Sequence, residues 1–416
     1  YPVETEWLDR PMPRDMRLAE QVARVLPDLL DRTEGGVLVF LPGEGEIRDA
    51  LGRLAGRLGD VPCLPLYGAL SLADQRRALT PGAGRRVVLA TAIAETSLTI
   101  PDVRVVVDGG RARRARFDPG SGMSRLVTER VTRAEADQRR GRAGRVAPGL
   151  CLRLWTKGED GALAAYPPAE IEAADLTPLA LDLAEWGESD LPFLTPPPEA
   201  ALSEARALLT DLGAVDGDGR LTGHGRRIAR MPLHPRLAHM LETAGKGAAD
   251  LAALLGERDP MRGAGADLSL RIRALREGGK YPALHRIRAE AKRLSRLAPE
   301  PRIDDPAAQL ALAYPDRVAL RRPGDLPRWL LSGGKGAKMA EDDPLAGQRV
   351  LVVADTDGHP REATIRLALP IGEGLLRETL GDRIVTAQEV VWSPRDGRVR
   401  AVEEERLGAI ALSSRR

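Results

Sequence analysis

One stretch of this 416-residue sequence says most about its fold: Gln138-Arg139-Arg140-Gly141-Arg142-Ala143-Gly144-Arg145. On a helix, Gln138, Arg142 and Arg145 fall on one narrow face, with Gly141 beside them. Guanidinium groups three residues apart can both reach one polyanion, and their fork geometry favours phosphate oxygens. A glycine in a helix costs roughly 1 kcal/mol relative to Ala, which makes sense if the backbone approaches another surface closely. The alternative is an exposed basic helix that contains these glycines by chance.

The region that leads up to and includes this stretch, residues 1–160, has the pattern of an α/β domain. Short apolar runs alternate with helical stretches, which is typical of a parallel sheet. We expect helices at 45–58 and 73–79, and strands at 37–41, 61–66, 87–90, 103–107 and 150–155. Arginine is dense and acids are sparse over 104–153. A basic face of this kind suits phosphate groups, although a solvated basic helix would look the same.

The remaining sequence changes character twice. We expect helices at 170–186, 199–212, 225–230 and 235–244, a turn at 216–219 and a short strand at 221–222. Together these outline a winged helix. Residues 251–297 are helical and basic. Strands expected at 317–320, 329–331, 349–354, 363–369, 384–392, 399–403 and 409–412 then indicate a small β-barrel.

The composition sets broad limits. Apolar residues make up 43% and charged residues 29% of the chain, so it can build cores and remain soluble, and its length suggests two to four domains. No run of about 18 apolar residues predicts a membrane span. With Cys63 and Cys151 alone, we expect no disulfide framework and no metal site. An intracellular, cytoplasmic setting fits best. The chain begins with Tyr1, so we expect a fragment or a processed protein.

A second functional stretch follows the expected strand at 87–90: Thr91-Ala92-Ile93-Ala94-Glu95-Thr96-Ser97-Leu98-Thr99-Ile100, then Pro101-Asp102. Hydroxyl and backbone N–H groups at the carboxyl end of such a strand lie where α/β sheets bind ligands. An ordinary strand-to-helix loop is the alternative. A third stretch, Leu38-Val39-Phe40-Leu41-Pro42-Gly43, is a strand that leads into a turn.

These three stretches resemble motifs VI, V and IV of the superfamily 2 helicases, in the form typical of DEAH proteins. Motif V departs at Ala92, where the family usually has Asn. The resemblance implies a RecA-like lobe in which Arg142 and Arg145 are arginine fingers that stabilise charge on the γ-phosphate. It implies nucleotide contacts for Gln138, Arg139, Ser97 and Asp102, with Arg139 also positioning the site. It implies nucleic-acid contacts for Thr91, Gly43, Thr96 and Arg116.

The resemblance extends over nearly the whole chain. Residues 111–131, with the turn signal Asp118-Pro119-Gly120-Ser121-Gly122, correspond to a β-hairpin that wedges near the 5′ side of the strand; a surface loop is the alternative. Asp259-Pro260 and Ala313-Tyr314-Pro315-Asp316-Arg317 resemble the HrpB-type bacterial branch. We therefore expect a multidomain α/β protein: a second RecA-like lobe at 1–160, a winged helix and the start of a ratchet helix at 161–245, a helical bundle at 246–312, and an OB-like barrel at 313–416.

The sequence contains neither G-x-x-x-x-G-K-[ST] nor Asp-Glu-Ala-His. In the family, ATP and Mg²⁺ are held mainly by a first RecA-like lobe, so we expect this chain to need that lobe as a partner and to be inactive alone. Single-stranded RNA or DNA is the other expected partner; we expect no membrane partner, and a monomer. The main alternative is a non-catalytic single-strand-binding module from a truncated or split helicase. An unrelated α/β protein is a third reading.

Overall fold

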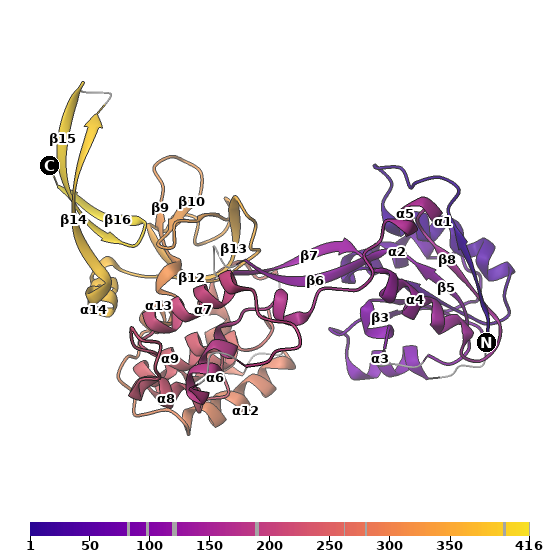
Figure 1. The fold of residues 1–416 in the computed structure, drawn as a ribbon, viewed down its shortest axis with the longest axis horizontal. Helices are drawn as coiled ribbons and strands as arrows, with labels where there is room; N and C mark the ends of the chain where they lie inside the picture. Colours follow the sequence, from indigo (N-terminus) through magenta and orange to yellow (C-terminus); the bar gives the residue numbers. More distant parts are fainter. Residues whose placement is uncertain are drawn as a thin grey trace. The chain divides into compact units, whose positions relative to one another are not determined.

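The computed structural model describes residues 1–80, 84–96, 100–118, 123–187, 191–261, 263–278, 281–393 and 397–415. It contains two compact units (Figure 1). The first unit comprises Tyr1–Ala115 and Leu126–Ala169, and the second comprises Arg116–Arg125 and Glu170–Arg416. The finer division into four domains remains a prediction.

A parallel sheet organises the first unit (Figure 1). Its described residues form a six-stranded sheet in the order β1-β8-β5-β2-β4-β3, with every neighbouring pair parallel. The strands are β1 (Val3–Trp7), β2 (Gly36–Phe40), β3 (Cys63–Leu66), β4 (Val87–Ala90), β5 (Val103–Asp108) and β8 (Gly149–Arg153). The parallel-sheet prediction is confirmed, and β1 is the strand that it missed.

Both faces of the sheet are covered, which explains why its strands are almost continuously apolar. Side chains such as Val37 and Val39 point to one face, where they pack with the helices α1 (Leu18–Asp31) and α2 (Glu44–Leu54). Their neighbours Leu38 and Phe40 point to the other face. That second face is covered by α3 (Leu72–Leu79), by Ala94 and Ile100, and by Ala143 of the opening octapeptide.

The strands β6 (Arg111–Asp118) and β7 (Met123–Arg130) pair as a two-stranded sheet, as the hairpin prediction required. The expected turn at Pro119–Gly122 lies outside the described residues. The helix α4 (Arg133–Gly141), a short 3₁₀ turn η3 (Arg142–Gly144) and α5 (Lys157–Gly161) complete the first unit.

Helices fill the first part of the second unit: α6 (Thr177–Trp186), α7 (Glu199–Asp211), α8 (Gly223–Ala229), α9 (Pro235–Ala244), α10 (Ala249–Leu255), α11 (Leu268–Glu277), α12 (Ala283–Ser295) and α13 (Pro306–Ala313). Val215 and Leu221 form an antiparallel bridge across the expected turn at 216–219. The helix expected at 170–186 was predicted too long. Its first residues form a separate 3₁₀ turn, η4 (Glu170–Glu172). The helix then starts afresh at Thr177, because Pro178 is tolerated only in a first turn.

The strand-rich end divides into two sheets. Among the described residues, β9 (Val318–Arg321), β10 (Arg328–Leu331), β11 (Gly336–Lys338), β12 (Val350–Thr356) and β13 (Glu362–Pro370) close a barrel. After α14 (Glu373–Leu380), β14 (Ile384–Ser393), β15 (Arg398–Leu407) and β16 (Ile410–Arg415) form a separate antiparallel sheet. The prediction of a single barrel over 313–416 was therefore wrong for β14, β15 and β16. These long strands are joined by short connections, so each pairs with its neighbour in the sequence.

Candidate functional site

The octapeptide begins on a well-capped helix. Thr132 and Glu135 form a capping box at the start of α4: the Thr132 N–H donates to Glu135 Oε2 at 2.7 Å, and the Glu135 N–H donates to Thr132 Oγ1 at 3.4 Å. Burial opposes ionisation of Glu135, but these hydrogen bonds and Arg114 outweigh it and lower its pKa. The octapeptide was expected to be helical throughout, but the helix ends at Gly141. It tightens into the 3₁₀ turn η3 at Arg142.

The two glycines of the octapeptide have different roles. A Cβ atom on Gly144 would lie 2.5 Å from the carbonyl oxygen of Tyr1 and 2.7 Å from the side chain of Val3. Gly144 therefore permits a close backbone approach, and the surface that it approaches belongs to its own unit. A Cβ atom on Gly141 would meet no described atom within 4 Å. The expectation of a close approach at Gly141 to another surface stays a prediction.

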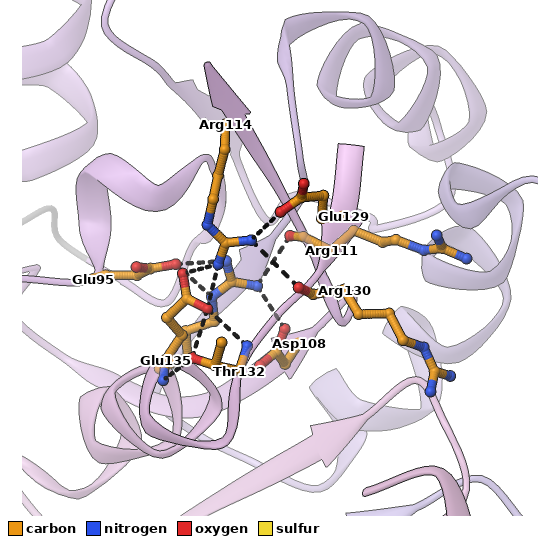
Figure 2. A network of polar contacts seen from close by, with 9 residues as sticks. Glu95, Asp108, Arg111, Arg114, Glu129, Arg130, Thr132 and Glu135 are labelled. Carbon is orange, nitrogen blue, oxygen red and sulfur yellow. Dashed lines mark hydrogen bonds and ion pairs between the residues drawn. The ribbon is translucent and has the colours of Figure 1, made fainter. Parts of the chain in front are cut away.

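Arg139 is the centre of a buried ion network, and Figure 2 labels its partners Glu95, Asp108 and Arg111. Its side chain is 1% exposed. Its Nε donates to Glu95 Oε1 at 2.7 Å, and its Nη1 donates to Asp108 Oδ1 at 2.8 Å and to the Arg111 carbonyl at 3.2 Å. Burial opposes the charge on Arg139, but the two carboxylates outweigh it and raise its pKa. Burial also raises the pKa of Glu95. The expected nucleotide contact does not fit Arg139 here, because the network occupies its guanidinium inside the unit.

Gln138, Arg142 and Arg145, which were predicted to face the nucleotide, differ in their exposure to solvent. Gln138 and Arg145 are exposed, whereas Arg142 is only 7% exposed. Burial lowers the pKa of Arg142, and the nearby charge of Arg145 lowers it further. The two guanidinium groups are thus electrostatic neighbours, as their spacing indicated. In this conformation Arg145 reaches solvent, and Arg142 lies more deeply within its own unit than a finger was expected to lie.

The predicted stretch from Thr91 to Asp102 is described at residues 91–96 and 100–102. Thr91 ends β4 and is half-buried, and Thr96 is exposed. Ser97 lies outside the described residues. Asp102 precedes β5 with a φ of 72°, and its carbonyl accepts from the Gly36 N–H at 2.7 Å. Thr91 is therefore at the carboxyl edge of the sheet and Asp102 is at the amino edge, so they do not form one cluster.

Gly43 and Arg113 lie close together at the carboxyl end of β2. Gly43 is buried, and a Cβ atom there would lie 2.5 Å from Arg113 Nη1. Arg113 also pairs with Glu46 at 3.3 Å. Arg113 was missed at the sequence level, because its position over Gly43 depends on tertiary structure. Arg116, also predicted to contact nucleic acid, is half-buried and is grouped with the second unit.

Two absences hold for the residues that the structure describes. None of the helices there combines the length and apolar character needed to cross a bilayer. The same residues contain no group of three or more His, Cys, Asp or Glu side chains that could hold a metal ion.

Known proteins match both the sequence and the fold. The sequence of residues 21–147 matches the protein family described as the helicase conserved C-terminal domain. The ATP-dependent RNA helicase HrpB of Escherichia coli is 38% identical over 427 residues, which cover 99% of this chain and 51% of HrpB. The ATP-dependent RNA helicase HrpA of E. coli is 35% identical over 262 residues, covering 59% of this chain and 20% of HrpA. A crystal structure of the E. coli DExH-box NTPase HrpB matches with a TM-score of 0.87 at 36% identity, covering 100% of this chain and 52% of that chain.

The chain therefore contains a helicase conserved C-terminal domain over residues 21–147. The predicted resemblance is confirmed: the chain is related, along nearly its full length, to the C-terminal half of the HrpB-type DEAH/RHA helicases. It spans about half the length of HrpB.

Proposed function

We propose that this chain is part of an ATP-dependent helicase that acts on nucleic acid, with RNA as the favoured substrate. In this proposal, the first unit supplies arginine fingers to a nucleotide held on a partner RecA-like lobe. Its sheet edge, the winged helix and the barrel supply contacts to a single strand. RNA is favoured because the relatives HrpB and HrpA carry the name of RNA helicases.

The observation that carries this proposal is the Arg139 network. Arg139 lies on the helix that leads to Arg142 and Arg145, and it is bonded to Glu95 of the segment that begins at Thr91. A displacement of that segment by a bound strand would therefore be transmitted to the arginine-bearing turn. Helicase action needs a mechanical connection of this kind between strand contact and nucleotide contact. We assign Arg139 to positioning and not to direct nucleotide contact.

The chemistry assigned to this chain is charge stabilisation. A guanidinium that reaches the γ-phosphate stabilises the charge that develops in phosphoryl transfer. Arg145 is the exposed candidate for this contact. Arg142 would join it after a small rearrangement of η3, with Gln138 and Asp102 as further nucleotide contacts. ATP hydrolysis generally uses Mg²⁺, but the described residues offer no group of ligands that would hold it. The roles proposed here are therefore those of the chain's own side chains.

The proposal is tested by ATPase assays in the presence of single-stranded RNA. We expect the chain alone to show negligible activity, and a mixture with a separately produced first lobe to hydrolyse ATP. In the mixture, Arg145→Ala should lower kcat by roughly 10³-fold. Arg140→Ala is the matched control, because Arg140 is a neighbouring, half-exposed arginine of α4. Activity of the chain alone, or equal effects of the two substitutions, would contradict the proposal.

A further inference from the structure

We infer that Arg113 binds a phosphate of the nucleic-acid backbone above Gly43, and that β6 connects this contact to the arginine-bearing helix α4. This inference rests on the proposed binding of nucleic acid by the chain. It adds a residue that the helicase motifs do not include, and a route by which strand binding affects the nucleotide side.

Tight backbone packing places Arg113 over Gly43. Gly109 follows β5, and its N–H donates to the Phe40 carbonyl at the end of β2, at 3.1 Å. A Cβ atom on Gly109 would lie 2.7 Å from that carbonyl oxygen, so a larger residue would push the chain away. The close approach directs the start of β6 across the carboxyl end of β2. The Arg113 guanidinium then covers Gly43, at the edge of the sheet where ligands of α/β folds bind.

The interaction that holds Arg113 in the absence of nucleic acid is weak and replaceable. Its Nη2 is 3.3 Å from Glu46 Oε1, and the two side chains are 36% and 32% exposed. Glu46 Oε2 is buried and makes no hydrogen bond to any described residue. Glu46 therefore supplies a counter-charge without a bidentate pair. A phosphodiester offers two oxygens in the geometry that a guanidinium prefers, so it can replace Glu46.

The alternation of side chains along β6 supplies the connection to α4. Arg114, the next residue, points to the opposite side, where it pairs with Glu129 at 3.2 Å and bonds to Glu135 of the capping box (Figure 2). Arg111 lies two residues before Arg113 in the same strand, and its carbonyl accepts a hydrogen bond from Arg139. A shift of β6 on phosphate binding would therefore act on the start of α4 and on its buried anchor. All of these residues belong to the first unit.

The first experiment measures binding of a fluorescein-labelled single-stranded RNA to the whole chain by anisotropy, over a series of salt concentrations. We expect Arg113→Gln to weaken binding about tenfold and to reduce the slope of log K against log salt by about 0.7. Glu46→Gln should tighten binding roughly two- to fivefold, because it removes the competing carboxylate. Arg48→Gln is the control: Arg48 is a 70% exposed arginine on α2, and its loss changes the net charge equally. An unchanged melting temperature shows that each variant is folded.

The second experiment measures RNA-stimulated ATPase after addition of a first lobe. We expect Arg113→Gln to raise the RNA concentration for half-maximal stimulation and also to lower kcat at saturating RNA. Unchanged affinity and salt slope in Arg113→Gln would overturn the phosphate contact. Weaker binding with full kcat at saturating RNA would overturn the connection through β6. Failure of the wild-type chain to bind RNA would overturn the proposed function itself, and this inference with it.

Discussion

Arg139 shows how much of the site's order can depend on one buried charge. One guanidinium serves Glu95 and Asp108, which are 9% and 0% exposed. Removal of one partner from a buried ion pair leaves an uncompensated charge, which is costlier than removal of the whole pair. The residue therefore contributes to the stability of the first unit, in addition to the positioning role proposed for it.

We predict that Arg139→Met will destabilise the first unit by about 3–5 kcal/mol, because two carboxylates lose their partner. Urea denaturation, followed by a probe in the first unit, measures this loss. Arg140→Met is the control, since Arg140 is 43% exposed and its pair with Asp137 is 3.8 Å long; surface pairs of this kind contribute about 0–1 kcal/mol. Equal destabilisation by the two substitutions would show that the buried network is not the source.

The site could be predicted only in part from the sequence. The spacing of Gln138, Arg142 and Arg145 predicted a shared helix face, but the helix ends at Gly141, and Arg142 is buried whereas the other two residues are exposed. The burial of Arg139 and Arg142 was not predictable, since their sequence context is the same as that of their exposed neighbours. Arg113 lay outside every motif, and its position over Gly43 follows from a contact between Gly109 and β2. The local spacing of charges was readable, but their tertiary partners were not.

At the scale of elements, Asp175 joins two helices of the second unit. Its Oδ1 accepts from the Thr177 N–H at 2.9 Å at the start of α6, and its Oδ2 contacts His234 Nε2 at 3.1 Å before α9. Burial opposes ionisation of Asp175, but the hydrogen bonds from His234 and Thr177 outweigh it and lower its pKa to about 2.

We predict that Asp175→Asn will destabilise the second unit by about 2 kcal/mol at neutral pH, since each pKa unit corresponds to about 1.4 kcal/mol. Because the folded-state pKa is depressed, this stabilisation is present above the ordinary value of 3.8 and is lost as the pH falls toward 2. Denaturation of both proteins across that pH range should therefore give converging stabilities. Asp182→Asn, at an exposed position on α6, should leave the stability nearly unchanged. A difference that persists at pH 2 would contradict the assignment to charge.

The elements that sequence reasoning missed have identifiable causes. The strand β1 (Val3–Trp7) carries two glutamates and pairs only at the edge of the sheet, so it lacks the apolar run of a central strand. The helix α1 contains Pro27, which usually argues against a helix interior. Its apolar face nevertheless packs on the sheet, and this tertiary packing outweighs local preference. The central strands were predictable because burial on both faces makes them continuously apolar.

At the scale of the whole molecule, the β6–β7 hairpin divides its residues between the two units. Met123, at the start of β7, is 4% exposed and packs in the same apolar cluster as Trp329 and Leu351 of the barrel. The Thr356 hydroxyl donates to its sulfur at 3.1 Å. Met123 is therefore part of the packing of the second unit. Its predicted role as a wedge remains to be tested.

Gly358 is the position at which this packing can be disturbed most selectively. It has a φ of +66°, and a Cβ atom there would lie 2.7 Å from Cβ of Arg125 and 3.0 Å from the Ser124 carbonyl oxygen. We predict that Gly358→Ala will cost about 2–4 kcal/mol, from backbone strain and from overpacking against the hairpin. Hydrogen exchange should then increase in β12 and in the hairpin end, because local opening follows local stability.

The same measurement determines whether the disturbance is confined to the second unit. Exchange in β2 and β5 should stay unchanged, because the sheet of the first unit has its own core. Gly347→Ala is the matched control, since a Cβ atom on Gly347 would meet no described atom within 4 Å. If exchange rises equally in β5 and β12, the two units unfold as one cooperative body. If Gly358→Ala behaves like Gly347→Ala, the hairpin end does not pack against the barrel in solution.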